Sequence, residues 1–260
     1  MRGNYHNNFK QDDVEPRMWS ISTEPKFGIG QRCLLLETDH GNVLWDLIAF
    51  LDDETIDFIK GKGGLKAIVI SHPHYYTTHL HWAETFDCPV YFAIEDEEWA
   101  CQPDDEGRRQ LIREGSEEIV PGVVAVKLGG HFPGSLVLIW DLKLFNADTF
   151  LTVPVSASSS TSWSDVANGW QSALYHVDRP PGTTSYAFMW SIPNMIPLPP
   201  SEMYKMWQAL KPFDFGSTHG AFVGVDVRDE HVKARVLESM KIQARAEGYA
   251  DHAILMESWP

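Results

Sequence analysis

Apolar and polar residues alternate in short blocks through the first 93 residues, and these blocks predict strands that alternate with helices. Compact apolar runs bounded by turn residues indicate strands, and a cluster of glycines ends the first helical stretch. The strands predicted from these blocks span residues 32–37, 43–46, 66–71 and 89–93, and the helices span residues 53–60 and 82–86. Strand–helix–strand alternation is typical of a layered α/β domain.

The rest of the chain has a different pattern, because short apolar runs follow one another with glycine and proline turns between them. This pattern is typical of antiparallel sheet. An acidic stretch, residues 94–115, predicts a helix before it. The later predicted strands span residues 123–127, 135–140, 143–147, 186–192 and 213–217, and the later helices span residues 200–210 and 229–246. Both halves place strands before helices, so two such units can pack sheet against sheet with their helices outside.

Length and composition are those of one globular domain. The chain has 260 residues, of which 43% are hydrophobic and 22% charged, enough apolar material for a sizeable core. Residues 1–17 are polar and predict a loose N-terminal arm, so we expect a single domain over residues 18–260. The arm carries no apolar run of a secretory signal, and no stretch approaches the roughly 18 apolar residues of a membrane span.

Charge and cysteine content limit the partners that we expect. The formal net charge is −15, and an acidic surface repels phosphate backbones and anionic lipid headgroups. A small molecule is therefore the expected partner, rather than nucleic acid or a membrane. The three cysteines form no CxxC pair, and their odd number argues against a disulfide framework. These features predict a soluble protein of the cytoplasm.

Histidines concentrate at one point of the chain, where four of the eleven lie between residues 72 and 81. His72 and His74 follow directly on a predicted buried strand, and residues i and i+2 of an extended segment point the same way. Three further metal-capable side chains, His131, Asp148 and His219, each follow a short apolar run in a polar or glycine-rich turn. Ligands at strand ends are held rigidly while coordination positions stay open, so the sequence predicts a metal site.

The order of these residues resembles the metallo-β-lactamase superfamily: a strand, HxH, an isolated loop histidine, a strand-terminal aspartate and a late His-Gly. The resemblance runs from about residue 33 to residue 220. It implies a four-layer αββα sandwich, in which two mixed β-sheets pack together with helices outside. It also implies that the metal ligands are His72, His74, His131, Asp148 and His219, and that Asp46 supports the site from behind its ligands.

One motif departs from the family. Where the family has HxHxDH, this chain has HPHYYT, so Tyr76 replaces an aspartate and Thr77 replaces a histidine. Both replaced groups ligate the second metal ion of the family. Loss of a carboxylate and an imidazole weakens the site for a second cation, so we expect one metal ion per chain. An imidazole-rich site suits zinc, with iron or manganese as alternatives. His79 and Thr77 are candidates for a substitute ligand or for a group that supports the ligands from behind.

The HPHYYT variant resembles a branch of lactamase-like hydrolases, many of them fungal. This implies a zinc-dependent hydrolase in which zinc-bound hydroxide opens a small cyclic amide, carbamate or lactone. Asp148 is then expected to orient the water or accept its proton, and the Tyr76 hydroxyl to donate to the oxyanion or the leaving atom. Aromatic residues are candidates for lining the substrate pocket, together with the long loop 156–181: Tyr75, Trp163, Trp170 and Trp190.

Three other functions remain open from the sequence. Phosphodiester or RNA-end hydrolysis is disfavoured, because such reactions use two metals to clamp the phosphate. A non-catalytic binding protein on a degenerate hydrolase scaffold would explain the two lost ligands, but not the retention of the three separate ones. A redox role with iron in the same site is the third.

Overall fold

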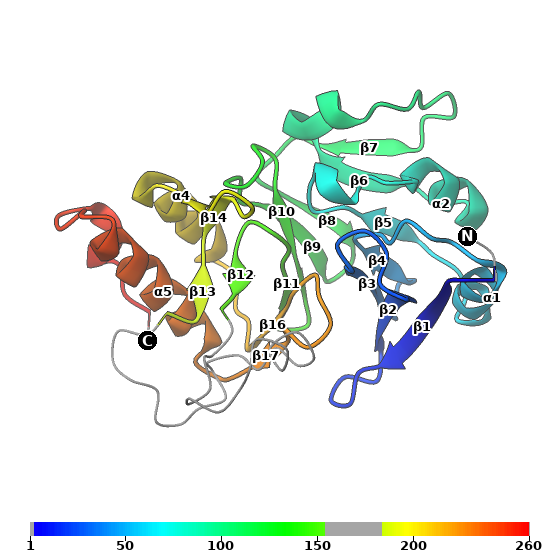
Figure 1. Ribbon diagram of the computed structural model, residues 1–260, viewed down its shortest axis with the longest axis horizontal. Coiled ribbons are helices and arrows are strands. Elements are labelled where there is room, and N and C mark those ends of the chain that lie inside the picture. Colours follow the sequence, from blue (N-terminus) through cyan, green and yellow to red (C-terminus); the bar gives the residue numbers. More distant parts are fainter. Residues whose placement is uncertain (1–2, 154–183, 260) are drawn as a thin grey trace.

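Two β-sheets pack face to face and helices cover their outer sides in the computed structural model, which describes residues 3–153 and 184–259 (Figure 1). The helices α1 and α2 lie against one sheet, and α4 and α5 lie against the other. This is the four-layer αββα sandwich that the sequence predicted.

The first sheet holds seven strands in sequence order. Its first four strands pair antiparallel and its last four pair parallel. The strands are β1 (His6–Gln11), β2 (Met18–Glu24), β3 (Arg32–Leu36), β4 (Val43–Trp45), β5 (Ala67–Val69), β6 (Val90–Ala93) and β7 (Arg109–Ile112). The helical elements of this half are α1 (Asp53–Gly61), α2 (His79–Phe86) and the short 3-10 helices η1 (Pro73–Tyr75) and η2 (Ile94–Trp99).

The second sheet holds six strands in the order β17-β16-β11-β10-β9-β8. Only β11 and β16 pair parallel in it. The strands are β8 (Ser116–Val120), β9 (Val123–Lys127), β10 (Leu136–Trp140), β11 (Lys143–Phe145), β16 (Ser217–His219) and β17 (Val227–Arg228). Two small ribbons pair β12 (Leu151–Thr152) with β13 (Tyr186–Ala187) and β14 (Met189–Ser191) with β15 (Ile196–Pro197). The helices are α4 (Pro200–Leu210), α5 (Val232–Ala246) and the 3-10 helix η4 (Ala253–Met256).

The alternation of side chains along each strand divides the core into three layers. On β3, Leu34 and Leu36 face the second sheet, whereas Leu35 faces the helices on the other side. On β10, Leu138 faces the first sheet and Val137 faces α4 and α5. Since successive residues of a strand point to opposite faces, a strand that is buried on both faces is apolar at consecutive positions, as in residues 33–36 of β3 and throughout β10.

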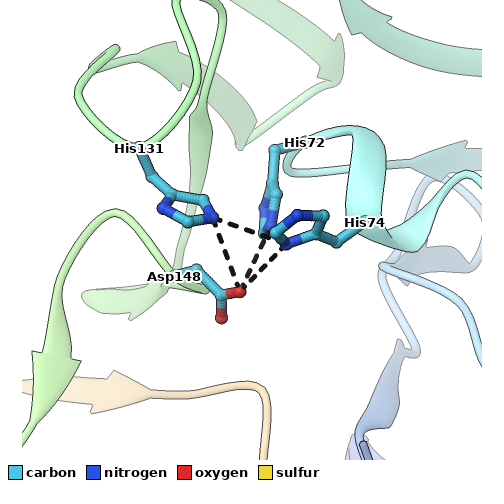
Figure 2. Close-up of side chains that lie close together, drawn as sticks. All are labelled: His72, His74, His131 and Asp148. Carbon is cyan, nitrogen blue, oxygen red and sulfur yellow. Dashed lines mark hydrogen bonds and ion pairs between the residues drawn. The ribbon is translucent and has the colours of Figure 1, made fainter. Parts of the chain in front are cut away.

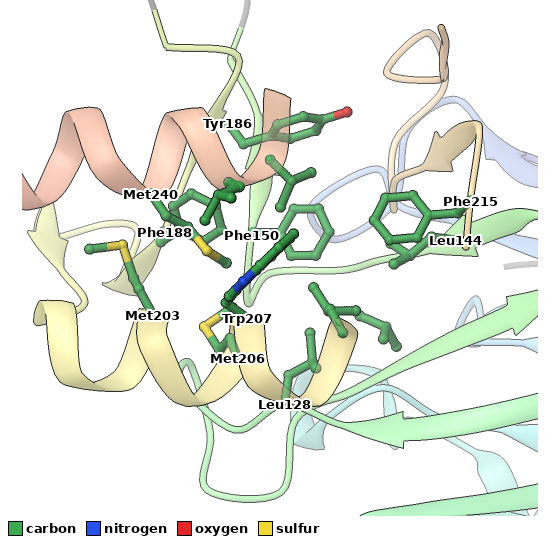
Figure 3. Packing of buried hydrophobic residues seen from close by; sticks show 14 of the residues in the cluster. Leu128, Leu144, Phe150, Tyr186, Phe188, Met203, Met206, Trp207, Phe215 and Met240 are labelled. Atoms are coloured by element: carbon green, nitrogen blue, oxygen red, sulfur yellow. The ribbon is translucent and has the colours of Figure 1, made fainter. Parts of the chain in front are cut away.

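The outer layer beneath α4 and α5 is packed with aromatic and methionine side chains. Figure 3 shows Trp207 at its centre, between Phe150 and the sulfur-bearing side chains of α4. Met203 and Met206 lie one turn apart on the same face of α4, and both are fully buried. Burial of apolar side chains therefore holds α4 and α5 against the second sheet.

The structure overturns two of the sequence predictions. The expected loose arm contains strand β1, which pairs with β2 along its full length. As an edge strand it buries only Asn7 completely, so its sequence carries no apolar alternation. The expected helix over residues 94–115 is instead the short η2 followed by strand β7. Pairing of β7 with the buried β6 outweighs the helix propensity of the acidic residues.

Met203→Ala is expected to lower the free energy of unfolding by about 2–5 kcal/mol, because it removes a fully buried side chain and leaves a cavity. The matched control is Met256→Ala, at a side chain that is 79% exposed, where we expect a change within about 0.5 kcal/mol. Urea denaturation of both variants measures the difference. Equal stabilities would contradict the packing described for this layer.

Candidate metal site

The site lies where strands from both sheets end. Asp46 follows β4 and His72 follows its parallel neighbour β5, so their side chains leave the same edge of the first sheet. Asp148 follows β11 of the second sheet, and His131 lies in the loop between β9 and β10. The Leu136 amide donates to the Ser71 carbonyl at 2.8 Å, which joins the two sheets beside the site.

Four of the predicted ligands converge on one point (Figure 2). Asp148 Oδ2 lies 3.4 Å from His72 Nε2, 3.4 Å from His74 Nδ1 and 3.8 Å from His131 Nε2. His131 Nε2 and His74 Nδ1 are 3.4 Å apart, and the four atoms all lie within 4.8 Å of one another. Tetrahedral ligands on bonds of about 2.0–2.1 Å are about 3.3–3.4 Å apart. The spacing of this group therefore fits one zinc-sized ion.

One atom of the group is buried without a hydrogen bond. His72 Nε2 is inaccessible to solvent and has no hydrogen-bond partner, and buried polar atoms are normally satisfied. Burial lowers the pKa of His72 to about 4, against the opposing effect of Asp148. The imidazole is thus neutral at physiological pH, the form that binds a metal.

A hydrogen-bonded chain behind His72 orients its ring. The Ser71 hydroxyl donates to Asp46 Oδ2 at 3.0 Å and therefore accepts from His72 Nδ1 at 2.9 Å, which leaves the Nε2 lone pair for the site. Asp46 Oδ1 also accepts the Ser71 amide at 2.7 Å. Asp46 adopts a left-handed backbone conformation, with φ of 57°, and burial raises its pKa to about 7. Asp46 thus supports the site through Ser71, which the sequence analysis did not single out.

The loop that carries His131 is fixed from both sides. His131 Nδ1 lies 2.8 Å from the Trp190 carbonyl. Since a carbonyl only accepts, Nδ1 donates, and Nε2 is free to bind a metal. The Asp96 carboxylate accepts the Gly134 amide at 3.0 Å. A Cβ at residue 134 would lie 2.5 Å from the Cβ of Ala93, so only glycine fits there.

The loop that carries Asp148 is tied to the His131 loop. The Asn146 side-chain amide donates to the Phe150 carbonyl at 2.7 Å and closes a turn around Asp148. The Thr149 hydroxyl donates to the Gly129 carbonyl at 2.5 Å. These two bonds set the position of the carboxylate relative to the imidazole of His131.

The structure corrects the assignment of the tyrosine. The Tyr76 hydroxyl donates to the Asp96 carbonyl at 3.2 Å, whereas the Tyr75 hydroxyl donates to Asp148 Oδ1 at 3.4 Å. The two side chains diverge because residues 73–75 form a 3-10 helix, in which successive side chains turn by about 120°. The phenol that meets the site thus comes from Tyr75, which the sequence proposed only for a pocket wall.

His79 and Thr77, the other candidates near His72 and His74, lie outside the group of ligand atoms. His79 Nδ1 faces the Tyr76 carbonyl at 2.8 Å, and its Nε2 accepts from Arg109 at 2.9 Å. Thr77 has a left-handed backbone with φ of 33°, and its buried hydroxyl has no hydrogen-bond partner. Neither residue belongs to the four-residue group, so the structure does not make His79 a substitute ligand.

His219 is also outside this group. Its ring is fully buried and stacks on Phe145, with Nε2 3.0 Å from the Ser217 hydroxyl and Nδ1 3.0 Å from Asp226 Oδ1. Arg32 of the first sheet is buried and makes an ion pair with Asp226, whose side chain is 18% exposed. The structure therefore places His219 in a polar junction between the sheets, and neither Asp226 nor Arg32 was singled out from the sequence.

Aromatic side chains flank one side of the ligand group. The Phe132 ring centroid lies 5.1 Å from that of His74 and 5.5 Å from that of His72. Trp99, which is 54% exposed, lies 5.6 Å from Phe132. Of the residues proposed for a pocket, Trp190 contributes its backbone carbonyl and has an exposed side chain. Trp163, Trp170 and the loop 156–181 lie outside the described residues.

Solved structures with the same architecture are metallo-β-lactamase-fold proteins. The metallo-β-lactamase FIM-1 from Pseudomonas aeruginosa, in its mono-zinc form, is 14% identical with a TM-score of 0.56, covering 94% of this chain and 96% of that one. A metallo-β-lactamase from Hirschia baltica is 14% identical with a TM-score of 0.54, over 91% and 97%. A flavo di-iron protein from Thermotoga maritima is 10% identical with a TM-score of 0.52, over 91% and 61%. The chain has the metallo-β-lactamase fold, as its sequence predicted.

A curated relative shows the family more narrowly. The uncharacterized protein YmaE of Bacillus subtilis is 34% identical over 246 residues, which cover 92% of this chain and 79% of YmaE. The chain belongs to the family of YmaE. No protein-family model matches it. Across the part of the chain that the structure describes, no helix has the length and apolar character needed to cross a membrane.

His131→Ala is expected to lower bound metal to less than about a tenth of the wild-type content under dialysis, because a three-histidine site loses a ligand. His219→Gln is the comparison, since both ring nitrogens of His219 have other partners, and we expect it to keep its metal while losing stability. Elemental analysis of the purified variants measures metal per chain. Loss of metal from His219→Gln with an unchanged melting temperature would make His219 a ligand.

Proposed function

We propose that this protein is a metal-dependent hydrolase that holds one zinc ion on His72, His74, His131 and Asp148 and opens a small cyclic amide, carbamate or lactone. The observation that carries the proposal is the spacing of the four ligand atoms: three of their separations are 3.4 Å, the length of an edge of a zinc tetrahedron, and all lie within 4.8 Å. An imidazole-rich set favours zinc over harder cations. A zinc ion held there supplies Lewis acidity, which polarises a carbonyl and acidifies bound water.

The residues around the ion support a catalytic role over a purely structural one. The His74 side chain is 49% exposed, so water can reach the group on one side, and a catalytic role would require water to take a coordination position beside the protein ligands. Asp148, by contrast, is buried, with 6% of its side chain exposed. Burial alone would raise the pKa of Asp148, but the neighbouring imidazoles of His72 and His74 outweigh it and hold the pKa well below its usual range. Its ionised carboxylate would offset part of the charge of the ion, and it would orient a water and accept its proton only where Oδ2 is not bound to the ion.

The surroundings of the group favour an uncharged substrate with apolar surface. The Phe132 ring packs against the ligand imidazoles and is continued outward by the exposed Trp99. The net charge of −15 disfavours phosphodiesters and nucleic acid as substrates. We propose a small molecule as the partner, and a reducing compartment such as the cytoplasm, because Cys33, Cys88 and the exposed Cys101 are free thiols.

The first experiment measures metal and activity together. Protein purified without added zinc is expected to carry about one zinc per chain by elemental analysis, and His72→Ala is expected to lose it. The wild type is then screened against lactams, cyclic carbamates and lactones, and removal of zinc with a chelator should abolish turnover until zinc is restored.

Three outcomes separate the alternatives. Zinc-dependent ring opening supports the hydrolase. Stoichiometric iron and no hydrolysis would favour a redox role. No metal after zinc is offered, in a folded protein, would overturn the metallohydrolase and favour a binding protein on a degenerate scaffold.

A further inference from the structure

Asp148 presents its two carboxylate oxygens to two different environments. Oδ2 faces the three imidazoles at 3.4–3.8 Å. Oδ1 faces away from them and accepts the Tyr75 hydroxyl at 3.4 Å. A carboxylate that is buried to this extent requires a partner for each oxygen. In this chain the partner of Oδ1 is a phenol.

Tyr75 is rigidly placed for this contact. Its side chain is fully buried in the layer between the first sheet and its helices. Its ring meets the His72 ring edge-on, with the centroids 4.9 Å apart. The Tyr75 amide also donates to the His72 carbonyl at 3.1 Å. The tyrosine therefore contacts a metal-ligand histidine and the metal-ligand carboxylate at the same time.

Three groups that could have brought a second cation to Oδ1 are engaged elsewhere. His219 is held by Ser217 and Asp226. Tyr76 is bonded to the Asp96 carbonyl. His79 is bonded to the Tyr76 carbonyl and to Arg109. A carboxylate can bind one cation or bridge two. A phenol that donates to one of its oxygens occupies one of the two lone pairs of that oxygen and occupies space that a second ion would need.

We propose that Tyr75 is a positioning residue that holds Asp148 Oδ1, so that only Oδ2 is offered to metal and the centre takes a single ion. This inference rests on the proposed metal site. In this proposal the Tyr75 hydroxyl orients the Asp148 carboxylate.

The test compares Tyr75→Phe with Tyr76→Phe, two variants that each delete one buried hydroxyl from adjacent residues. Zinc affinity is measured by competition with a chromophoric chelator. Tyr75→Phe is expected to weaken zinc binding by about 10–100-fold, the usual effect of removing a group that orients a ligand. Tyr76→Phe is expected to stay within about twofold of the wild type, because its hydroxyl bonds to a backbone carbonyl away from the group.

A spectroscopic measurement separates positioning from general loosening. Co²⁺ replaces zinc, and its visible absorption bands report the ligand geometry. We expect the bands to change in Tyr75→Phe and to match the wild type in Tyr76→Phe. Melting temperatures of the metal-free variants establish that both fold. If Tyr75→Phe does not fold, the wild type and Tyr76→Phe are labelled with 3-fluorotyrosine and studied by ¹⁹F NMR. A Tyr75 chemical shift that does not change when zinc is added overturns the inference.

Failure of the inference differs from failure of the proposed function. A wild type that binds neither zinc nor cobalt overturns the metal site itself. A wild type that binds one ion, with Tyr75→Phe equal to Tyr76→Phe in affinity and spectrum, overturns only the role of Tyr75. Two ions per wild-type chain at saturating zinc would also overturn it, because Oδ1 would then be available to metal.

Discussion

A buried carboxylate surrounded by imidazoles is the constraint on which the site end of this molecule depends. Asp148 carries a negative charge where little water reaches it, and such a charge is costly unless it is paired or bound to a metal. His72 and His131 each direct the Nε2 lone pair toward the same point, and His74 Nδ1 also faces it. Lone pairs and an anion repel without a cation between them, so the arrangement is complementary to a positive ion.

Holding that arrangement requires both sheets. His72 comes from the first sheet and Asp148 from the second, and the backbone bond from Leu136 to Ser71 joins the two sheets beside them. The side-chain bond from Thr149 to Gly129 joins the loops of Asp148 and His131. The site is therefore a product of the sandwich, and relative displacement of the two sheets would disperse it.

Three of the side chains that the resemblance to the metallo-β-lactamase superfamily places around a second ion make hydrogen bonds within the protein instead. Tyr76 bonds to the Asp96 carbonyl, and His79 bonds to Arg109. His219 forms a buried junction with Asp226 and Arg32. Each of these polar groups is paired within the protein, which offsets the cost of burying it. Fold neighbours include a protein in a mono-zinc form and a flavo di-iron protein, so the fold alone does not determine how many metals a chain holds.

The sequence by itself determined the layered fold and the convergent ligands, because both depend on local pattern. The apolar runs of β3 and β10 indicate strands that are buried on both faces, and a metal-capable side chain such as His72 or Asp148 is recognisable shortly after a strand. Tertiary structure decided what local pattern does not contain. The polar segment β1 is a strand because it pairs with β2. Part of the acidic segment 94–115 forms strand β7 and not a helix, because it pairs with β6. The 3-10 helix at residues 73–75 placed the Tyr75 hydroxyl, and not that of Tyr76, against Asp148. Asp226 pairs with His219, which lies outside the ligand group. In each case the deciding partner is distant in sequence or depends on a turn angle, so only the folded chain brings it into contact.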